Sequence, residues 1–283
     1  MSSLQGKVVI TTGGTQGVGE AVAIHAAQAG AAGVVLCGRQ EEKGQAVAAR
    51  VEACGSEALF VRADLGNVED CRHVVCRCDE RFGRVDGLVN AAADTHRGTL
   101  DNTTVEFWDH QFAVNVRGPF LLCQEVVAIM QRENIAGSIV NIQSVASYCG
   151  LPFLLSYSCT KGALATMTKN LANTLRQHRI RVNGVNLGWT DTPAEHVVQK
   201  LQGAPEDWLE QGEAASPFDR LLKADDVAKL CLYLLSDDSG ILTGSNIDYS
   251  QRVVGVFPPE PDSGEVQGWT QVDGGVLPVR GLS

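Results

Sequence analysis

A tyrosine and a lysine stand four positions apart, at Tyr157 and Lys161, in a stretch with helical periodicity. Residues four apart share one face of a helix, so the phenol and the ammonium are expected to lie side by side. A free tyrosine has a pKa of about 10, and a neighbouring cation favours the phenolate and lowers that pKa. Such a tyrosine can pass a proton to or from a substrate oxygen. Taken alone, the pair also fits an ordinary tyrosine beside a solvated lysine.

Ser144 follows the apolar run Ser138 to Ile142, which is predicted to be a strand. Ligands of open parallel sheets bind beyond the carboxyl ends of the strands. A hydroxyl at this place could donate a hydrogen bond to a substrate oxygen and hold it near Tyr157. Serine is also common as a helix cap or turn residue, and that interpretation stays open for the serine alone.

The segment from Thr12 to Gly19 reads Thr-Gly-Gly-Thr-Gln-Gly-Val-Gly, between an apolar run and a predicted helix. Glycines let the backbone turn sharply and approach a pyrophosphate, while the helix N-terminus offers free N–H groups and a positive dipole end. A strand before and a helix after are the context that supports such a motif. The sequence therefore predicts a nucleotide-binding turn here.

Short apolar runs alternate with helical stretches along the chain. Continuous apolar runs imply strands covered on both faces, and their alternation with helices implies right-handed βαβ units. The predicted fold class is therefore α/β, a Rossmann-type doubly wound parallel sheet. The expected strands are 8–10, 34–36, 58–61, 85–89, 138–142 and 181–187. The expected helices are 20–28, 41–53, 156–177 and 224–236.

No linker or internal repeat divides the chain, so residues 1–250 are predicted to form a single domain. Residues 189–222 lack a strand pattern and are expected to form a small helical cap. After Tyr249 the chain is rich in proline and glycine. Residues 251–283 are therefore expected to form an irregular C-terminal extension, packed on the same domain or on an interface.

The 283 residues carry a net charge of −10, which disfavours nucleic acid or an anionic membrane as the main partner. Nine cysteines without a signal-peptide pattern argue against a disulfide framework, and no uninterrupted apolar run suits a bilayer. We expect a cytoplasmic protein with no nucleic-acid or membrane partner. The cluster of Cys71, Cys76 and Cys78 fits no standard zinc spacing, so no metal site is expected.

Together, the Thr-Gly-x-x-x-Gly-x-Gly turn, Ser144 and a Tyr-x-x-x-Lys motif thirteen residues after that serine resemble the short-chain dehydrogenase/reductase family. The resemblance covers roughly residues 5 to 249. It implies hydride transfer between a nicotinamide cofactor and the alcohol or carbonyl group of a small organic substrate. The implied catalytic residues are Asn115, which holds a water in the proton relay, Ser144, which orients the substrate, Tyr157, the acid/base, and Lys161, which binds the nicotinamide ribose and lowers the tyrosine pKa.

The resemblance also implies cofactor contacts along the carboxyl edge of the sheet, from the adenine ring to the nicotinamide carboxamide. The implied cofactor-binding residues are Gly13, Thr15, Gln16, Gly17, Val18, Gly19, Arg39, Asp64, Leu65, Asn90, Ala91, Ala92, Tyr157, Lys161, Leu187, Gly188, Thr190 and Thr192. Family members are usually dimers or tetramers. Two long helices, around Val105 to Arg132 and Ser156 to Gln177, resemble those that pair between subunits, which favours a homotetramer over a homodimer.

The choice between NADP and NAD depends on the end of the second strand, at Gly38 and Arg39. NAD enzymes of this fold place an acidic residue there, which accepts hydrogen bonds from the ribose 2′-hydroxyl. Gly38 has no side chain to repel a phosphate, and the Arg39 guanidinium can pair with a 2′-phosphate. NADP is favoured. NAD stays possible, because the Gly-rich turn adds no basic residue and Glu41 and Glu42 lie nearby.

The substrate is expected to be an alcohol or ketone with an apolar body, with sugars and polyols left open. Candidate wall residues are Val145, Cys149, Phe153, Trp189, Trp208 and Phe218, of which Phe218 is expected to pack in the core. His96, His110 and His196 are expected to be surface or capping residues. Two alternatives remain at this point: an epimerase or dehydratase on the same fold, and a non-catalytic dinucleotide-binding sensor.

Overall fold

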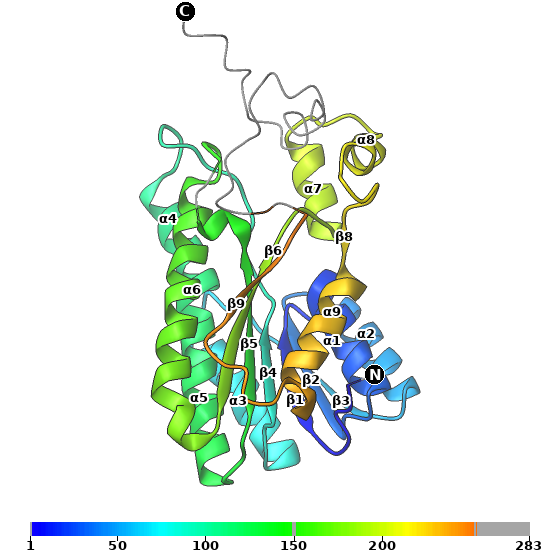
Figure 1. Ribbon diagram of the computed structural model, residues 1–283, viewed down its shortest axis with the longest axis vertical. Coiled ribbons are helices and arrows are strands. Elements are labelled where there is room, and N and C mark those ends of the chain that lie inside the picture. Colours follow the sequence, from blue (N-terminus) through cyan, green and yellow to red (C-terminus); the bar gives the residue numbers. More distant parts are fainter. Residues whose placement is uncertain (1, 149–150, 252, 254–283) are drawn as a thin grey trace, which may run out of the picture.

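Seven parallel strands form the central sheet of the computed structural model, which describes residues 2–148, 151–251 and 253. The strand order is β3-β2-β1-β4-β5-β6-β9, so the direction of winding reverses between β1 and β4 (Figure 1). This confirms the doubly wound α/β fold. The strands are β1 (Val8–Thr12), β2 (Gly33–Gly38), β3 (Glu57–Arg62), β4 (Gly87–Asn90), β5 (Ser138–Ser144), β6 (Arg181–Leu187) and β9 (Asn246–Tyr249).

Helices cover both faces of the sheet (Figure 1). Neighbouring residues of β1 point to opposite faces, and both Val9 and Ile10 are fully buried. Val9 belongs to the core formed with α1 (Gly17–Gln28), α2 (Glu41–Ala53) and α9 (Ala224–Leu235). Ile10 belongs to the core formed with α3 (Val68–Phe82), α5 (Gly118–Arg132) and α6 (Leu155–Leu175). Burial on both faces explains the continuous apolar runs of the strands.

The observed helix bounds differ from the predicted ones at places where a turn glycine or a capping side chain sets the end of the helix. Helix α1 begins at Gly17 rather than at residue 20, because the Gly-rich turn supplies its first turn. Helix α3 was not predicted. The Asn67 side chain caps it by accepting hydrogen bonds from the N–H groups of Glu69 (2.8 Å) and Asp70 (3.2 Å), and Gly83 ends it with a φ of 66°.

Helix α4 (Val105–Phe112), a π-helical turn (Ala113–Arg117) and α5 follow one another without a break. By length and composition alone, this stretch is the one helix in the described part of the chain that could cross a membrane. Its α5 half packs against α3 and the sheet, and its Leu122, Val126 and Met130 side chains are fully buried. We therefore treat it as a core helix. The π turn places Asn115 inside the fold, and such turns are frequent at functional sites.

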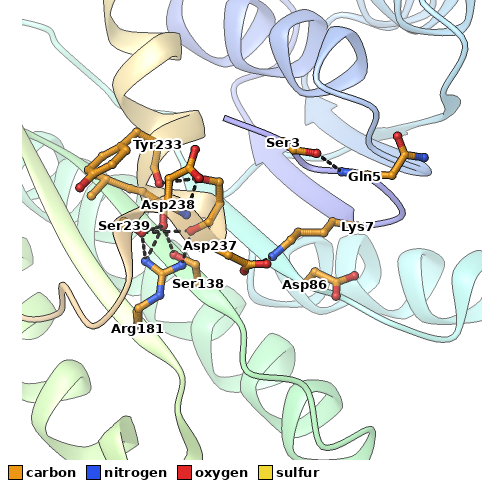
Figure 2. A network of polar contacts seen from close by, with 12 residues as sticks. Ser3, Gln5, Lys7, Asp86, Ser138, Arg181, Tyr233, Asp237, Asp238 and Ser239 are labelled. Atoms are coloured by element: carbon orange, nitrogen blue, oxygen red, sulfur yellow. Dashed lines mark hydrogen bonds and ion pairs between the residues drawn. The ribbon is translucent and has the colours of Figure 1, made fainter. Parts of the chain in front are cut away.

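The amino end of the sheet is tied to the end of α9 by Arg181, the first residue of β6 (Figure 2). Its guanidinium donates hydrogen bonds to the carbonyl oxygens of Leu234 (2.6 Å) and Ser236 (2.9 Å) and to the Ser239 hydroxyl. Ser138, at the start of β5, also donates to the Leu234 carbonyl, at 2.7 Å. The last carbonyls of a helix lack intrahelical partners, so this cation satisfies them and complements the helix dipole.

A small helical cap lies between β6 and α9 and ends one residue beyond the predicted range 189–222 (Figure 1). It contains α7 (Pro193–Leu201), α8 (Trp208–Ala214) and a short parallel pair, β7 (Thr190–Asp191) and β8 (Leu222–Lys223). The pair was not predicted, because two residues show no periodicity. Of the predicted extension 251–283, the structure describes Gln251 and Val253, and the remainder lies outside the described residues.

Candidate active site

A cleft of about 1700 Å³ lies between the carboxyl ends of the strands and the cap. Pockets for small ligands usually measure about 300–1000 Å³, so this cleft has room for a dinucleotide together with a substrate. It lies at the edge of the sheet where doubly wound folds bind ligands. The sequence-predicted residues that line it are Gly13, Thr15, Gln16, Gly17, Val18, Gly19, Arg39, Asp64, Leu65, Ala91, Ala92, Ser144, Tyr157, Leu187, Gly188, Thr190 and Thr192.

The Gly-rich turn has the shape that a pyrophosphate requires. Gly13 and Gly17 have φ values of 65° and 61°, in the left-handed region that side chains rarely adopt. A Cβ on Gly19 would lie 2.5 Å from the carbonyl oxygens of the preceding turn, so the chain folds closely over the start of α1. The N-cap residue, Gln16, makes no side-chain capping bond, which leaves the helix N-terminus facing the cleft. These residues fit the phosphates of a nicotinamide dinucleotide.

Thr12 joins the ends of β1 and β4 beneath this turn. Its hydroxyl accepts hydrogen bonds from the backbone N–H groups of Ala91 (2.9 Å) and Ala92 (3.0 Å), and both alanines line the cleft. The Asn90 side chain does not reach the cleft. It is 2% exposed and donates to the Oδ1 atom of Asn141 on β5 at 2.8 Å. Asn90 therefore joins β4 to β5 and positions the backbone that follows it.

Arg39 lines the cleft at the end of β2, and Lys43 reaches its rim through Gln16. A Cβ on Gly38 would lie 2.7 Å from Cγ2 of Thr15, so a side chain at this position would displace Thr15. Arg39 is exposed on the cleft wall. The Nζ atom of Lys43, in the first turn of α2, donates a hydrogen bond to Oε1 of Gln16 at 3.4 Å. Lys43 was missed by the sequence analysis, because its reach to the Gly-rich turn depends on how α2 packs beside α1.

Ser144 and Tyr157 meet across the cleft floor. Ser144 ends β5, Tyr157 lies in the first turn of α6, and their hydroxyls share a hydrogen bond. Desolvation raises the pKa of Tyr157 to about 12. The hydrogen bond from Ser144 and the charge of Arg97 lower this pKa, while the charge of Glu195 raises it. The two hydroxyls are therefore placed to act on one substrate oxygen.

Lys161 and Asn115 lie behind this pair rather than on the cleft wall. The Lys161 side chain is buried, its Nζ atom lies 5.6 Å from the Tyr157 ring centroid, and it donates to the Ile142 carbonyl at 2.8 Å. Burial lowers the pKa of Lys161 to about 8. Asn115 is 1% exposed, and its Nδ2 donates to the Thr160 hydroxyl at 3.1 Å. Lys161 therefore joins α6 to β5, and Asn115 joins α6 to the loop after β4.

Aromatic side chains form the wall of the cleft below the cap. The Trp189 and Trp208 rings lie 5.7 Å apart, and Phe153 and Val145 face the same cleft. The expectation that Phe218 packs in the core is wrong, because its side chain is 73% exposed in the segment between α8 and β8, at the cleft. Cys149 lies outside the described residues.

An ion pair interrupts this apolar wall. Arg97, in the segment after β4, donates from Nη2 to Oε1 of Glu195, in the first turn of α7, at 3.1 Å. The sequence analysis singled out neither residue. They are 98 positions apart, so no local spacing pattern connects them.

His96 and His110 line the cleft, whereas the clustered cysteines are not among its lining residues. The His96 and His110 side chains are 64% and 48% exposed, and both contact Asp94. This agrees with the surface role expected for them. Cys71 and Cys78 are buried while Cys76 is exposed. No group of three or more histidine, cysteine or acidic residues in the described part of the chain could hold a metal ion.

Comparisons with known proteins agree with this geometry. The profile of the enoyl-(acyl carrier protein) reductase family matches residues 13–250. An uncharacterized oxidoreductase of Thermotoga maritima is 36% identical over 89% of this chain and 100% of its own length. The NADP-dependent (R)-specific alcohol dehydrogenase of Lentilactobacillus kefiri is 33% identical over 86% of this chain and 94% of its own length.

A solved structure gives the same result. A variant of a Serratia marcescens short-chain dehydrogenase/reductase matches with a TM-score of 0.79 at 29% identity, over 88% of this chain and 98% of that chain. The protein transfers hydride between a nicotinamide cofactor and the alcohol or carbonyl group of a small substrate. It belongs to the short-chain dehydrogenase/reductase family.

Proposed function

We propose that this oxidoreductase prefers NADP(H) and acts on a small alcohol or ketone, with Tyr157 as the acid/base. The observation that carries the cofactor assignment is the end of β2, where Gly38 has no side chain and a Cβ would displace Thr15. Arg39 lines the cleft here and Lys43 reaches its rim through Gln16, so a 2′-phosphate would meet cations instead of a carboxylate. The NADP dependence of the Lentilactobacillus kefiri relative supports the assignment.

When bound, the nicotinamide supplies or accepts the hydride. The Tyr157 phenol holds the proton at the substrate oxygen, giving it up in reduction and taking it in oxidation. The Ser144 hydroxyl, hydrogen-bonded to that phenol, donates to the same oxygen and stabilises negative charge that develops there. Lys161 lies behind the Tyr157 ring and adds a positive charge on that side when it is protonated.

The cofactor assignment is tested by titrating the protein with NADPH and with NADH and following the fluorescence of each reduced cofactor. NADPH is expected to bind about tenfold more tightly or better, because a charged guanidinium would contact the phosphate. Arg39→Gln and Lys43→Gln should each weaken NADPH far more than NADH. Arg50→Gln, on the same helix but paired with Glu20, is the matched control and should change neither affinity. Tighter binding of NADH by the unchanged protein would overturn the assignment.

We also propose a cytoplasmic homotetramer. The helical stretch Val105–Arg132 leaves two large apolar side chains in solvent, Val105 at 70% and Phe120 at 45% exposure, which supports a subunit contact on this face. The eight cysteines in the described part of the chain are all free, which is consistent with a reducing compartment. Light scattering that gives the mass of a monomer at working concentration would contradict the assembly.

A further inference from the structure

Arg97 and Glu195 form an ion pair in the wall of the cleft that Tyr157 also lines. Their side chains are 20% and 12% exposed, and both line the cleft. The Arg97 guanidinium also stacks over the Phe153 ring, 5.7 Å from its centroid. Arg97 comes from the segment after β4 and Glu195 from the cap, so the pair joins the two sides of the substrate region.

The two partners differ in how many of their hydrogen-bonding groups are in use. Glu195 is well supplied with donors: Oε1 accepts from Trp189 Nε1 at 2.9 Å, from Gln199 Nε2 at 2.7 Å and from Arg97 at 3.1 Å. Arg97 uses Nη2 alone for its bonds to Glu195. Its Nε atom is buried and has no partner among the described residues. A buried donor without an acceptor is costly, so the arginine has donor capacity for a further group.

Arg97 also lies close enough to the reacting centre to matter for the substrate. Its charge acts on the Tyr157 phenol, and Glu195 acts on the same phenol with the opposite sign. Arg97, Ser144 and Tyr157 line the same cleft, so a substrate whose oxygen lies at Tyr157 and Ser144 extends along a wall that contains Arg97. The other wall groups near this place, Phe153 and Trp189 among them, present mainly apolar surface.

We propose that Arg97 is a specificity-determining residue that binds a carboxylate of the substrate, so that the substrate is a hydroxy acid or the corresponding keto acid. Glu195 is a positioning residue. Trp189 and Gln199 donate hydrogen bonds to its carboxylate, which accepts from the Arg97 guanidinium and holds it in the wall. In oxidation, the hydroxy acid loses a hydride from its carbinol carbon to the oxidised cofactor and its hydroxyl proton through Tyr157. The products are the keto acid, the reduced cofactor and one proton. The inference rests on the proposed function and names its substrate class.

A neutral polyol would need acceptors as well as donors from this wall. Oε1 of Glu195 is already shared by three donors and Oε2 accepts from Arg97 at 3.3 Å, whereas Arg97 adds donors only. A planar fork of donors is matched by a carboxylate, which can take two parallel hydrogen bonds from one guanidinium. The arrangement therefore favours the acid over the neutral analogue of the same shape.

The experiment measures the binding of benzoate and of benzamide, its neutral analogue, by calorimetry with the protein saturated with oxidised cofactor and with the protein alone. Benzoate is expected to bind about tenfold more tightly than benzamide, since charge-assisted hydrogen bonds carry the difference. Arg97→Gln should abolish that preference, and Arg97→Lys should retain part of it. Arg220→Gln, which changes another arginine of the cleft that pairs with Asp226, is the matched control and should leave the preference unchanged.

Glu195→Gln separates carboxylate binding from a merely structural ion pair. It keeps an acceptor for Trp189 but removes the charge that competes for Arg97, so benzoate should bind several times more tightly. Equal affinity for benzoate and benzamide, or a preference that survives Arg97→Gln, would overturn the proposal. Failure of the proposed function would give a different result. The cofactor absorbance would then not change with any alcohol or ketone, while calorimetry would still report the preference for benzoate.

Discussion

Asn115 holds the backbone of Asp94 at both of its polar groups: its Oδ1 accepts from the Asp94 N–H at 2.7 Å, and its Nδ2 donates to the Asp94 carbonyl at 2.9 Å. The π turn between α4 and α5 places Asn115 beneath the segment that leaves β4. That segment continues to Arg97 in the cleft wall. Asn115 is thus connected to the substrate region through the backbone, in addition to the water-holding role that the family resemblance gives it.

Replacing Asn115 by alanine should therefore cost both stability and activity. Three hydrogen bonds are lost, one buried and two partly buried, and the Asp94 N–H is left without the partner that Asn115 supplies, so we expect the free energy of unfolding to fall by about 2–4 kcal/mol. Urea unfolding measures this loss. Asn173→Ala, at an exposed position of α6, serves as the control and should change stability by less than about 0.5 kcal/mol. Equal stability of the two variants would contradict the positioning role.

Tyr157→Phe keeps the aromatic ring and removes the transferable proton. Turnover should fall at least about a hundredfold, because general acid–base catalysis contributes factors of that size and larger. Cofactor affinity should stay nearly unchanged, since the phenol is not needed to hold the dinucleotide phosphates. Steady-state kinetics and cofactor titration check the two halves separately. Tyr233→Phe, on α9 and 39% exposed, is the matched control and should retain normal turnover.

The buried ammonium of Lys161 predicts a pH dependence of stability. Burial lowers its pKa from 10.5 to about 8, so between these values the unfolded chain binds a proton that the folded protein does not. The contribution of Lys161 to stability is therefore fully present above about pH 10.5 and is lost as the pH falls through about 8. Its slope approaches about 1.4 kcal/mol per pH unit at most.

Urea unfolding is measured at pH 8 and at pH 10 for the unchanged protein and for Lys161→Met. The difference between the two proteins isolates the contribution of Lys161 to stability. The comparison is needed because buried thiols such as Cys123, whose pKa burial raises to about 12, act in the opposite direction over the same range. As the pH rises, the free energy of unfolding of the unchanged protein should increase relative to that of the variant. Parallel pH profiles would show that Lys161 carries no such shift.

The parts of the fold that could be predicted from the sequence are those that a local sequence pattern determines. Strand β1 is a run of apolar residues buried on both faces, and the Gly-rich turn after it needs glycine for steric reasons that hold in any context. Helix α2 was predicted with its observed bounds, Glu41–Ala53. Ser144, Tyr157 and the cofactor turn therefore came to one cleft as expected.

The parts that did not follow depend on tertiary contacts. Strand β9 has four residues at the edge of the sheet, and its alternation of polar and apolar residues, Asn-Ile-Asp-Tyr, is too short to distinguish a strand from a loop. Lys43 reaches Gln16 because two helices pack side by side, and Arg97 reaches Glu195 because the cap lies over the loop after β4. Phe218 was assigned to the core by its hydrophobicity, and its exposed position at the cleft is set by the cap.

Arg181→Met tests whether the amino end of the sheet serves stability alone. The guanidinium bonds to the end of α9 are lost, and the carbonyls of Leu234 and Ser236 lose their cation, so unfolding should become easier by about 2–3 kcal/mol. The KM for any substrate should stay unchanged, because the cleft is at the other end of the strands. Arg176→Met, on the exposed turn after α6, is the control for removing a surface arginine. A raised KM in Arg181→Met would show coupling between the two ends.

Substitution of two helix glycines, Gly19 in α1 and Gly162 in α6, tests the role of the Gly-rich turn in cofactor binding. A Cβ on Gly19 would lie 2.5 Å from the carbonyl oxygens of both Thr12 and Gly13, so Gly19→Ala forces the turn away from α1. A Cβ on Gly162 would meet only the Ser147 carbonyl oxygen, at an ordinary 3.6 Å. Gly162→Ala should therefore fold normally and gain up to about 1 kcal/mol from helix propensity.

Gly19→Ala should weaken NADPH and NADH by the same factor, because the displaced turn faces the phosphates that the two cofactors share. This distinguishes it from Arg39→Gln, which should act on NADPH alone. Fluorescence titration of both cofactors against both glycine variants gives the result, with thermal unfolding to show that each variant is folded. Normal cofactor binding by a folded Gly19→Ala protein would mean that the dinucleotide does not lie on this turn, since a backbone forced out of place by a clash of this size cannot present the same N–H groups.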